Sequence, residues 1–162
     1  MKDLVVLIIQ SCSEMECFVD TTSNQEDIEL PVLVGLHLGN MKNLKEVCCG
    51  PPPVGFFEKL EELYIEDCEQ LHSIFPRECK LPKLKILNID GCRAALLFSV
   101  SVAQSLSQLE ELIMRCCGEL KHIITEEEDG GDTNTGKEIV PASQNSHLIL
   151  PNLKKLSVCF CD

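Results

Sequence analysis

The sequence predicts an α/β-type repeat solenoid: a curved, right-handed superhelix with a short-stranded parallel sheet on its concave face and mostly irregular convex loops. One apolar pattern, L-x-x-L-x-I-x-x-C-x-x-L-x-x-I in residues 60–74, recurs in related form along the whole chain. This spacing is neither the 3.6-residue period of a helix nor simple strand alternation. In addition, five of the eleven cysteines occupy one position of the pattern.

Six copies of the pattern begin at Leu4, Leu33, Leu60, Leu84, Leu109 and Leu153, which are 29, 27, 24, 25 and 44 residues apart. A period in the twenties with this leucine spacing is typical of a leucine-rich-repeat solenoid. One unit buries about six apolar side chains at roughly 2 kcal/mol each, less than the cost of ordering its backbone. The repeats must therefore stack, and we expect one domain over 1–162, with five full repeats and a partial sixth.

The elements follow from this register. Residues around each L-x-L should form a short strand, with Leu63 and Ile65 inward and Tyr64 outward. Residues 20–31 are expected to form a polar loop, and the proline triplet of 48–55 an extended segment. Residues 99–108 are the best candidate for a convex helix. Residues 125–147 are acidic and then rich in Gly, Thr, Asn and Ser, which predicts a mobile insertion. Because neither end shows a polar cap, we expect a segment of a longer receptor or a truncated copy.

The recurring cysteines are expected to be small buried thiols that fasten the loop after each strand: Cys12, Cys68, Cys92, Cys117 and Cys161. Each lies in its own loop, so we expect them to stay reduced, which suits a reducing compartment.

The net charge of −12 argues against binding to nucleic acids or anionic membranes, because both depend on basic clusters. We therefore expect no nucleic-acid partner. The longest apolar runs are too short for a membrane span, and the first repeat already uses the apolar residues of the N-terminus. The sequence thus favours a cytoplasmic protein.

No catalytic, cofactor-binding or metal-binding residues are predicted. Residues 131–138, GDTNTGKE, fit most of a phosphate-binding loop pattern, but Glu138 replaces the hydroxyl residue that would hold Mg²⁺. The cysteine pairs lack the C-x₂₋₄-C spacing of structural zinc sites. The acidic pairs Glu61–Glu62 and Glu110–Glu111 share one repeat register, which indicates a solvated face and not an acid–base pair.

Two features extend beyond the general repeat. The segments CEQLHSI and CGELKHI carry C-x-x-L-x-x-I, and L-P-x-L leads into the repeats at Leu81 and Leu150. These features, with the acidic stretch IITEEEDGG, resemble the repeats of plant coiled-coil nucleotide-binding leucine-rich-repeat disease-resistance receptors. The resemblance implies a non-enzymatic protein-interaction module that senses a pathogen effector or a modified host protein. It also implies contact with the receptor's own nucleotide-binding module, which the repeats hold inactive.

An alternative is the substrate-receptor repeat of an F-box type ubiquitin ligase, which also carries cysteine at this register. Those repeats continue into an I-T-D-x-G-L segment and keep a nearly constant length. Neither property is present here.

A partner is expected on the concave face. The expected protein-binding residues are His37, Glu62, Tyr64, Glu66, Asp67, Asn88, Asp90, Glu111, Ile113, Arg115 and Lys155. The middle of this face should be acidic and its last strand basic, which favours a basic partner surface. His37, Tyr64 and Ile113 are expected to be exposed there, where aromatic and apolar groups add contact area.

Overall fold

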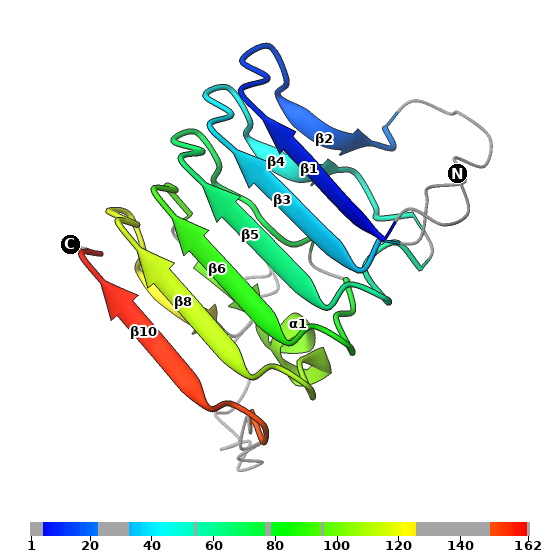
Figure 1. The fold of residues 1–162 in the computed structure, drawn as a ribbon, viewed down its shortest axis with the longest axis vertical. Helices are drawn as coiled ribbons and strands as arrows, with labels where there is room; N and C mark the ends of the chain where they lie inside the picture. Colours follow the sequence, from blue (N-terminus) through cyan, green and yellow to red (C-terminus); the bar gives the residue numbers. More distant parts are fainter. Residues whose placement is uncertain are drawn as a thin grey trace, which may run out of the picture.

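Six parallel strands stack along the chain in the computed structural model, which describes residues 5–22, 33–53, 55–76, 79–94, 96–125 and 150–161. Each of the six repeats contributes one strand to a single sheet of order β1-β3-β5-β6-β8-β10 (Figure 1). The strands are β1 (Val6–Gln10), β3 (Gly35–Gly39), β5 (Glu62–Glu66), β6 (Ile86–Asp90), β8 (Glu111–Arg115) and β10 (Lys155–Cys159). The predicted parallel solenoid is confirmed.

The sheet register aligns the repeat leucines in two inward rows. The first row is Leu7, Leu36, Leu63, Leu87, Leu112 and Leu156, and the second is Ile9, Leu38, Ile65, Ile89, Met114 and Val158. Those of β3, β5, β6 and β8 are at most 1% exposed. Each fully buried side chain contributes about 1.5–3 kcal/mol. Stacking therefore supplies the core that no single repeat could build.

Behind the main sheet, the chain forms more regular structure than the expected irregular loops. Short strands β2 (Cys17–Asp20) and β4 (Glu46–Cys49) pair in parallel, and so do β7 (Leu96–Ser99) and β9 (His122–Thr125). The expected helix is present but shorter, as α1 (Val100–Ser105), with the Ser99 hydroxyl accepting from the Val102 amide at its start. Its end at Ser105 fits the weak helix propensity of the β-branched Val100 and Val102.

A line of phenylalanines connects successive repeats on this rear side. Phe18 lies 6.2 Å from Phe56, measured between ring centroids, and Phe56 lies 4.7 Å from Phe57. Phe75 stacks on Phe98 at 5.5 Å. Aromatic pairs at these distances add about 0.5–1.5 kcal/mol beyond their buried area. The rear layer is thus a packed part of the core.

The five recurring cysteines occupy the predicted position. Each thiol donates to the carbonyl oxygen two residues earlier, as in Cys68 to Glu66 at 3.4 Å and Cys117 to Arg115 at 3.2 Å. Cys68, Cys92 and Cys117 are buried, whereas Cys12 and Cys161, on the terminal repeats, are partly exposed. The thiols therefore fasten the turn after five of the six strands, as predicted, whereas Met41 occupies this position after β3.

That turn requires a left-handed residue directly after every strand of the main sheet. The φ angles are positive at Ser11 (59°), Asn40 (50°), Asp67 (51°), Gly91 (64°), Cys116 (50°) and Phe160 (54°). The left-handed residue still donates its own backbone N–H to the neighbouring strand, for example Cys116 N–H to the Cys159 carbonyl at 3.0 Å. Only glycine adopts it without steric cost.

We expect Cys116→Gly to stabilise the chain by roughly 0.5–1 kcal/mol, because relief of left-handed strain exceeds the added freedom of the unfolded chain. Gly91→Ala should destabilise the chain, because alanine is strained at this φ of 64° and its Cβ would lie 2.9 Å from Asp67 Oδ1. Urea unfolding of both variants measures the two effects. Equal signs for the two would contradict the conformational explanation.

The insertion predicted at 125–147 lies outside the described residues except for Thr125, the last residue of β9. The phosphate-loop-like segment at 131–138 and most of the loop at 20–31 also lie outside them.

Candidate functional site: the open face of the sheet

The main sheet has one face that the rear strands do not cover, and we call it the open face (Figure 1). Its outward side chains form three rows across the strands. The first is Val6, Gly35, Glu62, Ile86, Glu111 and Lys155; the middle is Ile8, His37, Tyr64, Asn88, Ile113 and Ser157; the last is Gln10, Gly39, Glu66, Asp90, Arg115 and Cys159. Ten of the eleven residues predicted for the binding surface lie in these rows.

Asp67, the eleventh predicted residue, is exposed but lies outside these rows. It lies beyond the end of β5, in the left-handed turn, where its amide donates to the Asp90 carbonyl at 2.9 Å. Side chains on one face recur every second residue. Glu66 already occupies the last position of this face on β5, so the next residue belongs to the turn.

The middle row contains the aromatic centre of the open face. The His37 and Tyr64 rings lie 4.4 Å apart, measured between centroids, with a tilt of 48°. Both side chains are partly buried and not fully exposed as expected. Ile113 was expected to be exposed, but only 8% of its surface is accessible. The reason is that a middle-row residue on an interior strand has neighbouring side chains on every side.

Asn88 lies between Tyr64 and Ile113 in the middle row, and its side-chain oxygen is unsatisfied within the described ranges. Its Oδ1 atom is buried and has no hydrogen-bond partner among the residues that the structure describes. An unsatisfied buried acceptor costs about 1–3 kcal/mol. The side-chain oxygen of Asn88 therefore has no hydrogen-bond donor in the described part of the open face.

The glutamates directly before β5 and β8, Glu61 and Glu110, each form an ion pair with a lysine of the next repeat. Lys85 Nζ lies 2.6 Å from Glu61 Oε2, and Lys154 Nζ lies 2.8 Å from Glu110 Oε2. On the open face itself, Lys155 pairs with Glu111 at 3.2 Å. The lysines expected to make the last strand basic are therefore engaged in ion pairs.

Glu62 and Glu66 differ from these residues. Both are exposed, and neither forms an ion pair with the described part of the chain. The register places Gly35 and Ile86 beside Glu62, and Gly39 and Asp90 beside Glu66, so no cation is adjacent in either row. Two carboxylates without an ion pair in the described part of the chain thus flank Tyr64 on the same face.

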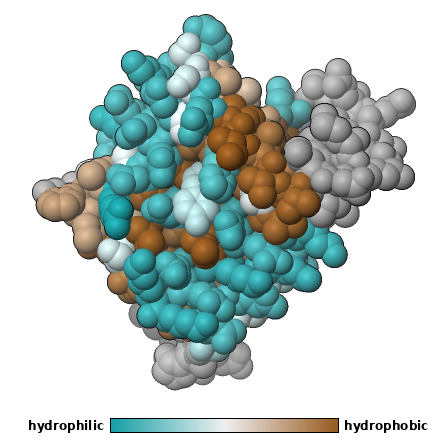
Figure 2. Space-filling model, viewed as in Figure 1, coloured by the Kyte–Doolittle hydropathy of each residue, from teal (hydrophilic) through white to brown (hydrophobic). Residues whose placement is uncertain are grey.

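Hydrophilic colour covers most of the open face in Figure 2, and hydrophobic colour gathers toward its β1 end. Val5, Val6 and Ile8 are 54%, 48% and 58% exposed there. The face therefore changes from apolar at β1 to acidic at β5, becomes mixed at β6, and carries the Glu111–Lys155 ion pair at β8 and β10.

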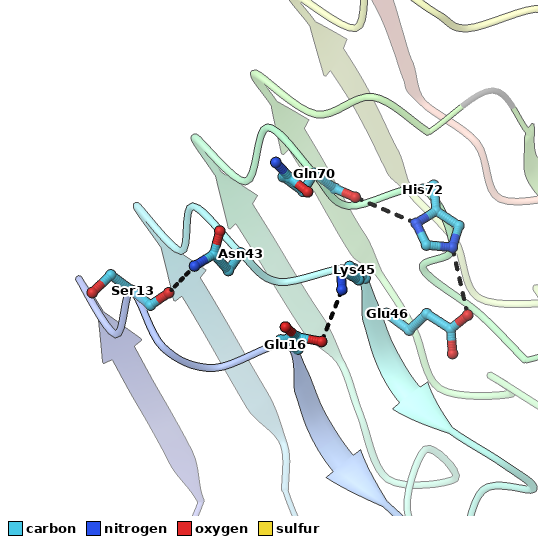
Figure 3. Close-up of polar contacts among 7 residues, drawn as sticks. All are labelled: Ser13, Glu16, Asn43, Lys45, Glu46, Gln70 and His72. Atoms are coloured by element: carbon cyan, nitrogen blue, oxygen red, sulfur yellow. Dashed lines mark hydrogen bonds and ion pairs between the residues drawn. The ribbon is translucent and has the colours of Figure 1, made fainter.

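A second polar surface lies beside the sheet, in the loops that follow the strands (Figure 3). Asn43 Nδ2 donates to the Ser13 carbonyl at 2.7 Å, Lys45 pairs with Glu16 at 2.8 Å, and His72 Nε2 lies 3.5 Å from Glu46. Each contact joins two consecutive repeats. Sequence reasoning did not identify these contacts, and their geometry indicates a role in aligning the loops.

Tyr64 is the only tyrosine, and the chain has no tryptophan, so its titration can be followed selectively. Burial, followed by the negative charges of Glu62 and Glu111, raises the pKa of Tyr64. We expect its phenolate absorbance to appear above the usual pH range of tyrosine, and Glu62→Gln to lower the midpoint. Glu58→Gln, on an exposed residue outside the face, is the matched control. A midpoint unaffected by Glu62→Gln would contradict the charge contribution.

Within the described ranges, no helix combines the length and hydrophobicity that crossing a membrane requires. The chain matches none of the curated proteins and none of the solved structures with which it was compared. One family model, described as the leucine-rich repeats of RPS2-like plant disease resistance proteins, matches residues 1–82 and 78–162. Those two matches together cover the whole chain, and the structure has the repeat architecture that the model describes. The chain therefore belongs to the leucine-rich-repeat family of RPS2-like plant disease resistance proteins.

Proposed function

We propose that this chain is the non-enzymatic interaction module of an intracellular, cytoplasmic plant immune receptor, and that its open face contacts another protein. The partner is a pathogen effector, a modified host protein or the receptor's own nucleotide-binding module. The observation that carries the proposal is the pair of exposed carboxylates, without ion pairs among the described residues, around the aromatic centre formed by His37 and Tyr64. An outward-facing aromatic pair adds contact area to a binding surface, and a surface without a partner gains little from it.

The family match favours this function over the F-box alternative. The 162 residues act in this proposal as one repeat domain of a larger receptor. The residues proposed to form the binding surface are His37, Glu62, Tyr64, Glu66, Asn88, Asp90, Glu111, Ile113, Arg115 and Lys155, with Asp67 in the turn at its edge. Within this surface Ile113 is buried, and its role in the proposal is to support the side chains around it.

The test is co-expression in leaf cells of this chain with the coiled-coil and nucleotide-binding modules of a receptor of this family. Autoinhibition predicts that the chain co-precipitates with those modules and reduces the cell death they trigger. Glu62→Lys/Glu66→Lys should abolish both effects, because two like charges then face the partner.

Glu58→Lys/Glu69→Lys is the matched control, since it makes the same change in net charge at exposed loop positions outside the open face. That variant should behave as the wild type does. Association that survives Glu62→Lys/Glu66→Lys would place the contact elsewhere on the solenoid.

A further inference from the structure

The open face has one place where negative charge, an aromatic ring and an unsatisfied acceptor come together. Glu62 and Glu66 lie two residues on either side of Tyr64, roughly 7 Å away along the strand. Asn88 occupies the adjacent position on β6. We call this group of four residues the Tyr64 site.

Each of the four residues has a group that can interact with a cation. The two carboxylates have no ion-pair partner among the described residues, although Glu61, Glu110 and Glu111 all have lysine partners. The Tyr64 ring, fixed against His37 on one side, offers a π surface that attracts cations. The Asn88 oxygen has no donor, and its terminal amide torsion is soft enough to turn toward one.

We propose that the Tyr64 site receives an arginine side chain from a basic segment of the partner protein. A guanidinium is planar and can stack on the tyrosine ring while its N–H groups donate to both carboxylates and to the Asn88 amide oxygen. A lysine ammonium carries the same charge but lacks the planar arrangement of donors. The excess of negative charge on the chain also attracts a basic segment over longer distances. The assignment rests on the proposed function, because it names the chemistry of the partner that the open face contacts.

The experiment uses the complete chain and a synthetic peptide of arginine, glycine and serine, with a matched peptide in which lysine replaces arginine. Neither peptide contains an aromatic residue, so protein fluorescence reports on Tyr64, the only tyrosine in a chain without tryptophan. We expect the arginine peptide to change this fluorescence, to bind more tightly than the lysine peptide and to weaken as salt is added.

Glu62→Gln/Glu66→Gln should weaken binding of the arginine peptide by roughly tenfold, because the glutamine oxygens can still accept hydrogen bonds but no longer carry the charge that strengthens them. Glu58→Gln/Glu69→Gln, which removes the same charge elsewhere, should change it by less than about twofold. Equal weakening by both double variants would overturn the site in favour of general attraction to an acidic protein. Equal affinity for the two peptides, or binding by calorimetry without a change at Tyr64, would overturn it as well.

The two proposals can fail separately. If the leaf-cell experiment shows no association while the peptide result holds, autoinhibition is rejected and the cation site remains. If association holds but the peptide result fails, the open face acts without an arginine at Tyr64.

Discussion

Replacing Leu87 with alanine is expected to lower the free energy of unfolding by about 2–5 kcal/mol. Leu87 is fully buried, and the register places it between Leu63 and Leu112 in the first inward row. The loss combines the transfer energy of the removed atoms with the cavity that they leave. Because the cavity opens between two stacked repeats, neither neighbour can close it alone. Urea unfolding followed by far-ultraviolet circular dichroism measures the change.

Leu156→Ala is the matched control for this prediction. Leu156 occupies the same inward row on β10 but is 57% exposed, since the described residues cover it on one side only. Its truncation should cost less than about 1 kcal/mol, in proportion to the smaller buried area. Equal losses at Leu87 and Leu156 would mean that stacking is not the main source of stability.

Raising the pH from 8 to 10.5 is expected to remove roughly 2 kcal/mol of stability through Cys79 alone. Burial, with a smaller contribution from nearby Cys48, raises the pKa of Cys79 to about 12. In the unfolded chain the thiol ionises near its ordinary pKa of about 9. Because the folded-state pKa is the higher one, the stability contributed by Cys79 is fully present below pH 9. It is lost as the pH rises from there toward 12.

Unfolding in urea at the two pH values measures this effect against Cys79→Val, which keeps an apolar group of similar size in the buried position. The variant should lose about 2 kcal/mol less than the wild type over the same pH range. Other alkaline titrations are common to both proteins and cancel in the comparison. Equal pH dependence of the two would show that the Cys79 thiol is not desolvated in the native chain.

The surface charges show where reasoning from single repeats reaches its limit. Glu61, Glu62, Glu110 and Glu111 have the same local sequence, Leu-Glu-Glu-Leu, so the sequence of one repeat does not distinguish them. Glu111 has Lys155 beside it on the next strand, whereas Glu62 has Ile86. The lysine partner comes from a different repeat, and only the sheet register shows which of these carboxylates has one beside it on the neighbouring strand.

The repeat pattern by itself determined the parallel sheet, the inward leucine rows and the buried cysteine position, because each depends on a period that is visible in the chain. It also determined which side chains of each strand share the open face, with the exception of Asp67. The tertiary structure alone decided the pairs β2–β4 and β7–β9, the burial of Ile113 and the missing donor at Asn88. These features depend on which residue of the neighbouring repeat lies about 4.8 Å away across the sheet. Because the spacing of the repeats varies from 24 to 44 residues, that neighbour has no constant separation along the sequence, and stacking is what defines it.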